Sequence, residues 1–162
     1  MPEGFVPLPI PVIVALYAVI WIGIHIGAGY LAHRLPLRLF ARGGVLCRAR
    51  RWERDGSVYR KVLVHRWKDA IPEAGSFFTG GFSKRALTGR DPAYLRRFIA
   101  ETCRAEFSHW LAAAAGATFF AWNPWYVGVI MLGYGVATNL PFAVVQRYNR
   151  ARFRRFLERH AG

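Results

Sequence analysis

Long apolar runs alternate with basic segments along the chain. Residues 4–33 contain no Asp, Glu, Lys or Arg, and residues 107–146 again contain none. A helix that crosses a membrane needs roughly 20 apolar residues. The first run therefore predicts one membrane span at 5–33. The second run is long enough for two spans, which we expect at 106–122 and 125–146.

The sequence "AWNPWY" at 121–126 divides the second run. Pro124 stops a helix and Asn123 favours a turn. The two tryptophans and the tyrosine of this segment are typical of the interface between lipid and water. The segment therefore predicts a hairpin whose tip lies at a membrane surface.

Between the spans, apolar residues recur among arginines. Residues 34–51 predict a segment that lies at the membrane interface, with arginine stems reaching toward headgroups. Residues 56–71 repeat apolar positions every three to four residues, which predicts an amphipathic helix, with a strand as the alternative. Residues 73–90 are rich in Gly, Ser and Thr and read as a loop. Asp91 and Pro92 then have the character of a helix start.

The charge is as unevenly spread as the apolar residues. The chain is 54% hydrophobic and carries a net charge of +14. Residues 1–33 hold no Lys or Arg, whereas 34–106 hold 17 and the tail 147–162 holds 6. The positive-inside rule predicts an N-terminus outside the cell, with the basic segment 34–105 and the C-terminal tail in the cytoplasm.

This placement narrows the partners and cofactors. Basic residues that flank apolar spans favour anionic lipid headgroups over nucleic acid. Cys47 and Cys103 both fall in the predicted cytoplasmic part, where a disulfide is not expected, and the histidines are too scattered for a metal site. We expect an all-α integral membrane protein with about three transmembrane helices, amphipathic interfacial helices on the cytoplasmic side, no metal and no cofactor.

Glu106 and His109 stand at the start of the second span. Three residues apart on a helix, they share a face. A carboxylate beside an imidazole can fix its tautomer and raise its basicity. Ionisable groups at the edge of lipid are costly and point to function. The pair predicts a general base, His109, oriented by Glu106, and the alternative is a solvated pair without a role. His25, in the first span, reads as a packing residue.

The third span ends in a dense polar patch. Arg147 and Arg150 are suited to grip a phosphate, a carboxylate or sugar hydroxyls, although a stop-transfer signal would need only their charges. The other polar residues of this patch are Asn139, Gln146, Tyr148 and Asn149.

Three motifs together resemble a known family. "VHRWKDAIPEAG", "ETCRAEFSHW" and "TNLPFAVVQRYNRARF" resemble, in the same order and at similar separations, segments of the glycosyl-4,4'-diaponeurosporenoate acyltransferases. These small bacterial membrane proteins esterify a fatty acyl chain onto the sugar of a carotenoid glycoside. The resemblance covers most of the chain from about Trp52 to Phe153. It marks Trp67, Lys68, Glu101, Arg104, Glu106, His109, Trp110, Asn139, Pro141, Gln146, Arg147, Tyr148, Asn149 and Arg150.

The resemblance implies a multi-pass acyltransferase of the bacterial cell membrane. Its acceptor would be a glycolipid such as a carotenoid glycoside, and acyl-CoA is one donor that the Arg-rich side would suit. From the chemistry of acyl transfer, rather than from the resemblance, we expect His109 to act as the base. Arg104, Arg147 or Asn149 would stabilise the oxyanion or hold the donor's phosphates. Two alternatives remain, another enzyme that modifies lipid headgroups (a reductase or methyltransferase) and a non-enzymatic membrane adaptor.

Overall fold

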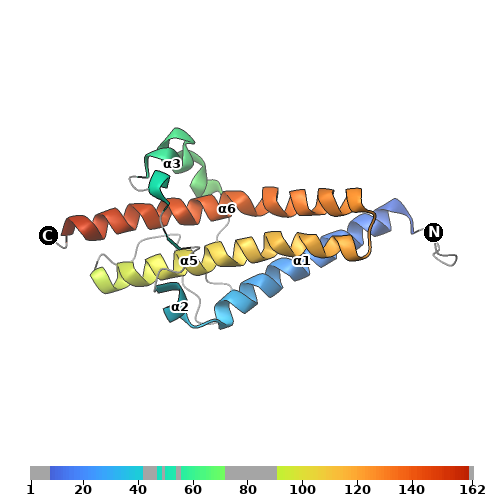
Figure 1. Cartoon of the computed structure of the whole chain (residues 1–162), viewed down its shortest axis with the longest axis horizontal. Coiled ribbons are helices and arrows are strands. Elements are labelled where there is room, and N and C mark those ends of the chain that lie inside the picture. Colours follow the sequence, from blue (N-terminus) through green and yellow to red (C-terminus); the bar gives the residue numbers. More distant parts are fainter. Residues whose placement is uncertain (1–7, 42–46, 49, 54–55, 72–90, 161–162) are drawn as a thin grey trace.

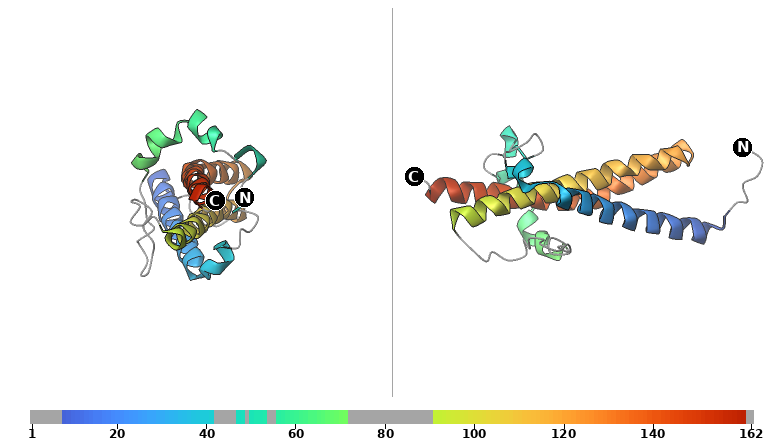
Figure 2. Two further views of the ribbon diagram at one scale, coloured as in Figure 1. Left: turned by 90° about the vertical axis from the view of Figure 1, so that its left-hand side faces the viewer. Right: turned by 90° about the horizontal axis from the view of Figure 1, so that it is seen from below.

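The protein is built around three long helices. The computed structural model describes residues 8–41, 47–48, 50–53, 56–71 and 91–160, and these residues contain helices and no strand. In Figures 1 and 2 the long helices lie along one another, and the short helices gather toward the end that holds the C-terminus. The long helices are α1 (Ile10–Arg34), α5 (Pro92–Ala115) and α6 (Trp125–His160). The prediction of an all-α protein is confirmed for the described residues.

Helices α5 and α6 form an antiparallel hairpin (Figure 1). The helix start predicted at Asp91 is confirmed: its side chain accepts from the backbone N–H groups of Ala93 and Tyr94, at 2.9 and 3.0 Å. Helix α5 is followed by a 3-10 helix, η3 (Gly116–Ala121). The chain then turns at Pro124 and enters α6. The hairpin predicted from "AWNPWY" is therefore present.

Helix α1 packs onto this hairpin through Trp21. The Trp21 ring is buried and stacks on Phe119, with centroids 5.6 Å apart. A Cβ at Gly135 would lie only 2.6 Å from the Trp21 ring, so glycine is needed at that point of α6. Nearer the tip of the hairpin, the Tyr17 hydroxyl donates to the side-chain oxygen of Asn123. These contacts fix α1 against the apolar part of the hairpin.

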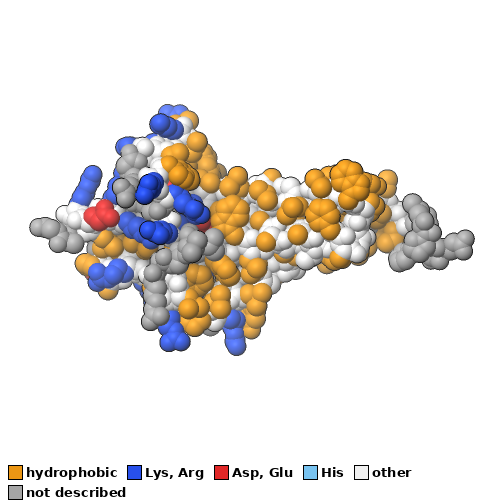
Figure 3. Space-filling view, viewed as in Figure 1, with side chains coloured by type: hydrophobic (Ala, Val, Ile, Leu, Met, Phe, Trp, Pro, Cys, Tyr) orange, Lys and Arg blue, Asp and Glu red, His pale blue; other side chains and the backbone are white. Residues whose placement is uncertain are grey.

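The apolar part of the molecule, which comprises α1, η3 and the first half of α6, leaves many large hydrophobic side chains exposed. Figure 3 shows hydrophobic side chains spread over this part with no charged side chains among them, and Lys and Arg clustered near the other end. Helices α1 and α6 are each long and apolar enough to cross a membrane, and only 6% of the most apolar stretch of α1 is buried. An exposed apolar surface of this extent indicates association with lipid. The third predicted span, 106–122, corresponds to the end of α5 with η3, and it stays a prediction.

The segment predicted as one amphipathic helix is broken. Residues 56–71 form three short helices, and Leu63 has a left-handed φ of 53° that interrupts the helix. The break lets Tyr59 and Val64 pack together on Val145 of α6, so the burial of these side chains overrides the helical periodicity. The prediction of a single helix is wrong. The short helices are α3 (Ser57–Lys61), α4 (Val64–Trp67) and η2 (Lys68–Ala70).

The segment after α1 packs on protein. Helix α2 (Leu37–Ala41) places Phe40 in a buried cluster with Ala100 and Cys103 of α5. Cys47 and Cys103 are joined as a disulfide, with Cα atoms 5.4 Å apart. The expectation of two unlinked cysteines is therefore wrong. The sequence does not show that the fold places Cys47 beside Cys103 in the cluster that Phe40 of α2 joins. The loop predicted at 73–90 lies outside the described residues.

Candidate active site

A buried carboxylate joins the two helices of the hairpin. The Glu106 side chain, on α5, is 0% exposed. One of its oxygens accepts from Arg147 Nε at 2.5 Å and from Trp110 Nε1 at 3.2 Å, and the other accepts from Arg150 Nη2 at 2.5 Å. Arg147 and Arg150 lie three residues apart and so share a face of α6. Each oxygen of Glu106 therefore accepts from an arginine of α6, and one of them also accepts from Trp110, one turn further along α5.

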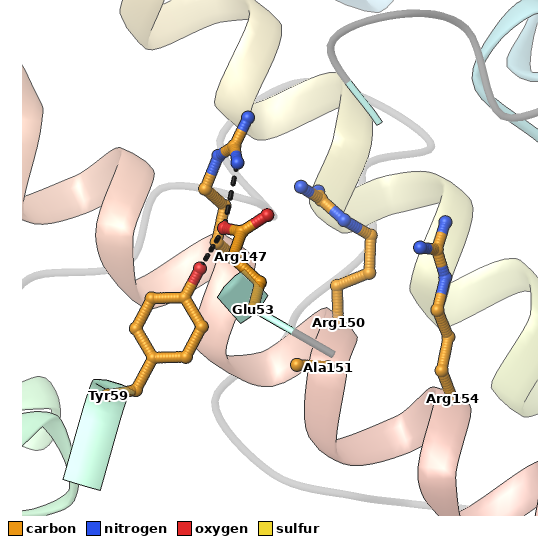
Figure 4. Close-up of a pocket in the computed structure, with 6 residues that line it drawn as sticks. All are labelled: Glu53, Tyr59, Arg147, Arg150, Ala151 and Arg154. Atoms are coloured by element: carbon orange, nitrogen blue, oxygen red, sulfur yellow. Dashed lines mark hydrogen bonds and ion pairs between the residues drawn. The ribbon is translucent and has the colours of Figure 1, made fainter. Parts of the chain in front are cut away.

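A second carboxylate extends this network to the short helices. Glu53 is the last residue of η1 (Arg51–Glu53) and is almost fully buried. It accepts from Arg147 Nη1 and from the Arg50 backbone N–H, both at 2.8 Å, and from the Tyr59 hydroxyl. Figure 4 shows Glu53 between Arg147 and Tyr59. A small pocket opens beside this cluster, lined by Glu53, Tyr59, Arg147, Arg150, Ala151 and Arg154.

The network sets the charge of Glu53. Burial alone would raise the pKa of this carboxyl, but hydrogen bonds from Tyr59, the Arg50 backbone and Arg147 outweigh burial and hold the pKa below its usual value. Burial and the neighbouring Glu53 carboxylate raise the pKa of the Tyr59 hydroxyl above its usual range. At neutral pH Glu53 is therefore ionised, and Tyr59 is the protonated donor.

We expect the lowered pKa of Glu53 to appear in the stability of the protein. A carboxyl whose pKa is lower in the folded than in the unfolded state stabilises the fold above its unfolded pKa, about 4.3, and loses that contribution as pH falls through the folded pKa. The apparent Tm in detergent should thus fall on acidification from about pH 5, by about 2–4 °C for each kcal/mol lost. In Glu53→Gln the Tm at neutral pH should be lower and its acid dependence weaker. An unchanged acid dependence in this variant would contradict the assignment.

His109 has a different partner from the one predicted. Its Nδ1 lies 3.0 Å from Oδ1 of Asn139, which is buried on α6, and its ring stacks on Phe142 with centroids 4.7 Å apart. The amide nitrogen of Asn139 donates to the Gly135 carbonyl at 2.9 Å and lies 3.3 Å from Nε2 of His25. Asn139, rather than Glu106, is thus the side chain that orients His109 in the structure.

The hydrogen bonds of this group fix the proton positions. Nδ1 of His25 lies 2.7 Å from the Trp21 carbonyl, which can only accept, so His25 carries its proton on Nδ1 and accepts at Nε2. Asn139 then donates to His25 and to Gly135 through its amide nitrogen and turns Oδ1 toward His109. Nδ1 of His109 must therefore be the donor, and in the neutral imidazole the lone pair is then on Nε2. The arrangement makes Nε2 of His109 the basic atom.

The other predicted residues lie in several places. Arg104 pairs with Glu101 at 3.2 Å and donates to the Leu35 carbonyl, so it belongs to a separate ion pair. Trp67 and Tyr148 pack in one cluster around Val145, and the Trp67 indole donates to the Val62 carbonyl. Lys68 pairs with Asp69. Gln146 is buried, with Oε1 lacking a hydrogen-bond partner among the described residues. Asn149 is partly exposed on α6.

Sequence reasoning missed Glu53, Tyr59 and the role of His25. Glu53 and Tyr59 carry no motif, and only the fold brings their short helices to α6. His25 did carry a signal. A histidine inside an apolar span is costly unless it has a polar partner, and Asn139 was the polar residue at a similar depth in the third predicted span.

The chain is similar to known proteins over most of its length. Residues 38–159 match the family described as glycosyl-4,4'-diaponeurosporenoate acyltransferase. A protein of that name from Staphylococcus haemolyticus (strain JCSC1435) is 28% identical over 144 residues, which cover 88% of this chain and 84% of the relative. One from Staphylococcus aureus (strain bovine RF122 / ET3-1) is 27% identical over 138 residues, covering 85% and 83%. No solved structure matches significantly. With a match of this extent, the chain belongs to the glycosyl-4,4'-diaponeurosporenoate acyltransferase family.

Proposed function

We propose that the protein is a membrane acyltransferase that moves a fatty acyl chain onto a sugar hydroxyl of a carotenoid glycoside or a related glycolipid. The family and the names of the relatives support this acceptor. The exposed apolar surfaces of α1 and α6 support a membrane location, where a glycolipid acceptor would be dissolved.

The proposal includes a topology. Helices α1, α5 with η3, and α6 cross the bacterial cell membrane, with the N-terminus outside and the basic end of the molecule in the cytoplasm. In that reducing compartment the Cys47–Cys103 pair would be held as two neighbouring thiols. The antiparallel hairpin and the gathering of Lys and Arg near one end support this topology, together with the positive-inside rule. The same basic end would meet anionic lipid headgroups.

The observation that carries the chemistry is the hydrogen-bond chain from the Trp21 carbonyl through His25 and Asn139 to His109. It holds His109 with its lone pair on Nε2, the form that a general base needs. In the proposed step, Nε2 takes the proton from a sugar hydroxyl as that oxygen attacks the acyl carbonyl. The tetrahedral intermediate then expels the leaving group, which receives the proton from His109.

The substrate-binding part of the proposal rests on the polar end of α6. A buried acceptor without a partner costs free energy, and Oε1 of Gln146 is such an atom among the described residues. A sugar hydroxyl that donates to Gln146 would remove this cost. Tyr148 and Asn149, next along the helix, would contribute further hydroxyl contacts. Arg147 is held by both carboxylates, so its role would be to set the charge of the site.

The proposed reaction is tested by product formation. Membranes containing the protein would be supplied with a glycosylated carotenoid and a mixture of acyl donors, and the extracted lipids compared by mass spectrometry with those from membranes without it. We expect a new species heavier by one fatty acyl group. Absence of that species with every donor would contradict this acceptor.

His25 and Asn139 are proposed as positioning residues for His109. Asn139→Leu removes the oxygen that accepts the Nδ1 proton of His109. We expect kcat to fall, but by less than the roughly 10²–10⁴-fold that general base catalysis contributes. His25→Gln, which can still accept from Asn139, should lose less. The pH dependence of kcat should change in Asn139→Leu, because the basicity of His109 is no longer tuned. An unaltered pH profile would contradict the positioning role.

A further inference from the structure

Aromatic rings gather where α1 meets α6. Trp21 lies against Gly135. Four residues further along α1, the His25 ring lies beside Asn139, which is itself four residues after Gly135. The two helices therefore run in the same direction at this contact, each advancing by about one turn. We call this contact the α1–α6 seam.

A row of six rings follows the seam from the tip of the hairpin inward. Contacting rings have centroids 5.1 to 5.7 Å apart. The members of this aromatic row are Trp122, Tyr17, Phe119, Trp21, Tyr134 and His25. The row covers the way from the tip to Asn139, a rise of about 21 Å along α6. It ends at His25, which belongs to the hydrogen-bond chain that holds His109.

The aromatic row is partly open at the surface. The Tyr134 ring is 49% exposed, although it packs edge-on against Trp21. Tyr134 lies about 14 Å along α6 from the tip, near the middle of a hydrocarbon core of about 30 Å, whereas tyrosine in membrane proteins is enriched at the interfaces. Between residues 10 and 26, the exposed large hydrophobic side chains of α1 are all aliphatic. Contact with lipid chains needs only aliphatic side chains, so the open ring of Tyr134 indicates a different partner.

From these observations we infer that the aromatic row binds the conjugated polyene of the acceptor. The inference rests on the proposed function, in which the acceptor is a carotenoid glycoside. Its sugar would lie at His109, and its polyene would run along the row toward the tip of the hairpin. The aromatic row would then select acceptors that carry a polyene over glycolipids with saturated chains.

The chemistry of a polyene matches the row in two ways. Its flat π system can stack on aromatic faces, which saturated chains cannot do, and its many close contacts add up in dispersion energy. A polyene is also rigid, so it loses less conformational freedom on binding than a saturated chain. Because a rigid chain cannot fold back, an acceptor whose sugar reaches His109 must lie along a straight apolar surface that starts there. The aromatic row is such a surface.

Visible circular dichroism of the full chain in detergent micelles tests the inference. A polyene held in one orientation on a protein acquires circular dichroism in its visible absorption band. The probe is a glucose ester of a carotenoid acid, and we expect titration with wild type to induce the band. Tyr134→Leu, which removes the ring and keeps an apolar side chain, should weaken binding about 5-fold, as expected for the loss of one ring contact. Tyr134→Phe, which keeps the ring, should bind like wild type.

Two controls show whether the effect belongs to the row and to the polyene. Tyr126→Leu makes the same change at another half-exposed tyrosine. Tyr126 precedes Gly135 by nine residues, about two and a half turns, and so lies on the opposite side of α6 from the seam. This variant should bind like wild type. Dipalmitoylglycerol bearing the same glucose, which has no polyene, should displace the carotenoid only weakly.

Three results would overturn the inference. They are equal carotenoid binding by wild type and Tyr134→Leu, absence of the induced band in wild type, and displacement by the saturated glycolipid at equal concentration. None of them depends on acyl transfer. Acylation of the carotenoid with unchanged affinity in Tyr134→Leu would remove the polyene site and keep the proposed function. Polyene binding that Tyr134→Leu weakens, without any acylation, would keep the site and remove that function.

Discussion

Replacement of His109 by Gln is expected to abolish acyl transfer while leaving the protein folded. Removal of a general base costs roughly 10²–10⁴-fold in rate, and Gln cannot take a proton at neutral pH. The fold should tolerate the change because the ring is only partly buried, against Phe142. The measurement is the initial rate of appearance of the acylated glycolipid by mass spectrometry, with the apparent Tm measured on the same preparation.

Ser108→Ala is a matched control for this prediction. Ser108 neighbours His109 on α5, and its hydroxyl donates only to the Ala105 carbonyl of the same helix. Loss of this hydroxyl should lower the stability by about 1 kcal/mol at most. It should leave the rate within about twofold of wild type, because the Ser108 hydroxyl touches no substrate in the proposed mechanism. A His109→Gln variant as active as Ser108→Ala would remove His109 from the chemistry and leave the family assignment intact.

Replacement of Glu106 by Gln is expected to destabilise the protein severely. The carboxylate is fully buried and balances Arg147 and Arg150. Removing one partner of a buried ion pair costs about 3–5 kcal/mol because the remaining charge stays uncompensated. At about 2–4 °C per kcal/mol for a chain of this size, the apparent Tm should fall by about 10 °C. Activity should be lost together with the folded protein.

The comparison of Tm and activity decides the role of Glu106. Sequence reasoning placed Glu106 as the group that orients His109, and on that reading Glu106→Gln would be folded but inactive, like His109→Gln. The contacts in the structure predict instead a variant with low Tm. Glu158→Gln, at an exposed position of α6, removes the same charge and should change the Tm little. A Glu106→Gln variant with wild-type Tm and no activity would restore the orienting role.

Much of the fold was predictable from local signals. The apolar runs are long and free of charge, so they indicated α1 and the α5–α6 hairpin. Asp91 and Pro92 marked a helix start by their own chemistry, and Pro124 marked the turn. By contrast, residues 56–71 have helical periodicity over too short a length to resist tertiary packing. Tyr59 and Val64 are buried against Val145, and the helix is broken to allow it.

Most residues of the candidate site could be predicted from the sequence, but which of them contact one another could not. The amino-acid sequence by itself determined where apolar and basic residues segregate, which fixes the long helices, and it singled out Glu106, His109, Asn139, Arg147 and Arg150 as polar groups at a costly depth. Spacing along one helix suggested that Glu106 serves His109. Only the tertiary structure decided otherwise, because α6 runs antiparallel to α5 and brings Arg147 and Arg150 to Glu106, and Asn139 to His109. An interhelical partner is set by packing, and a buried carboxylate pairs with the cation that packing places beside it.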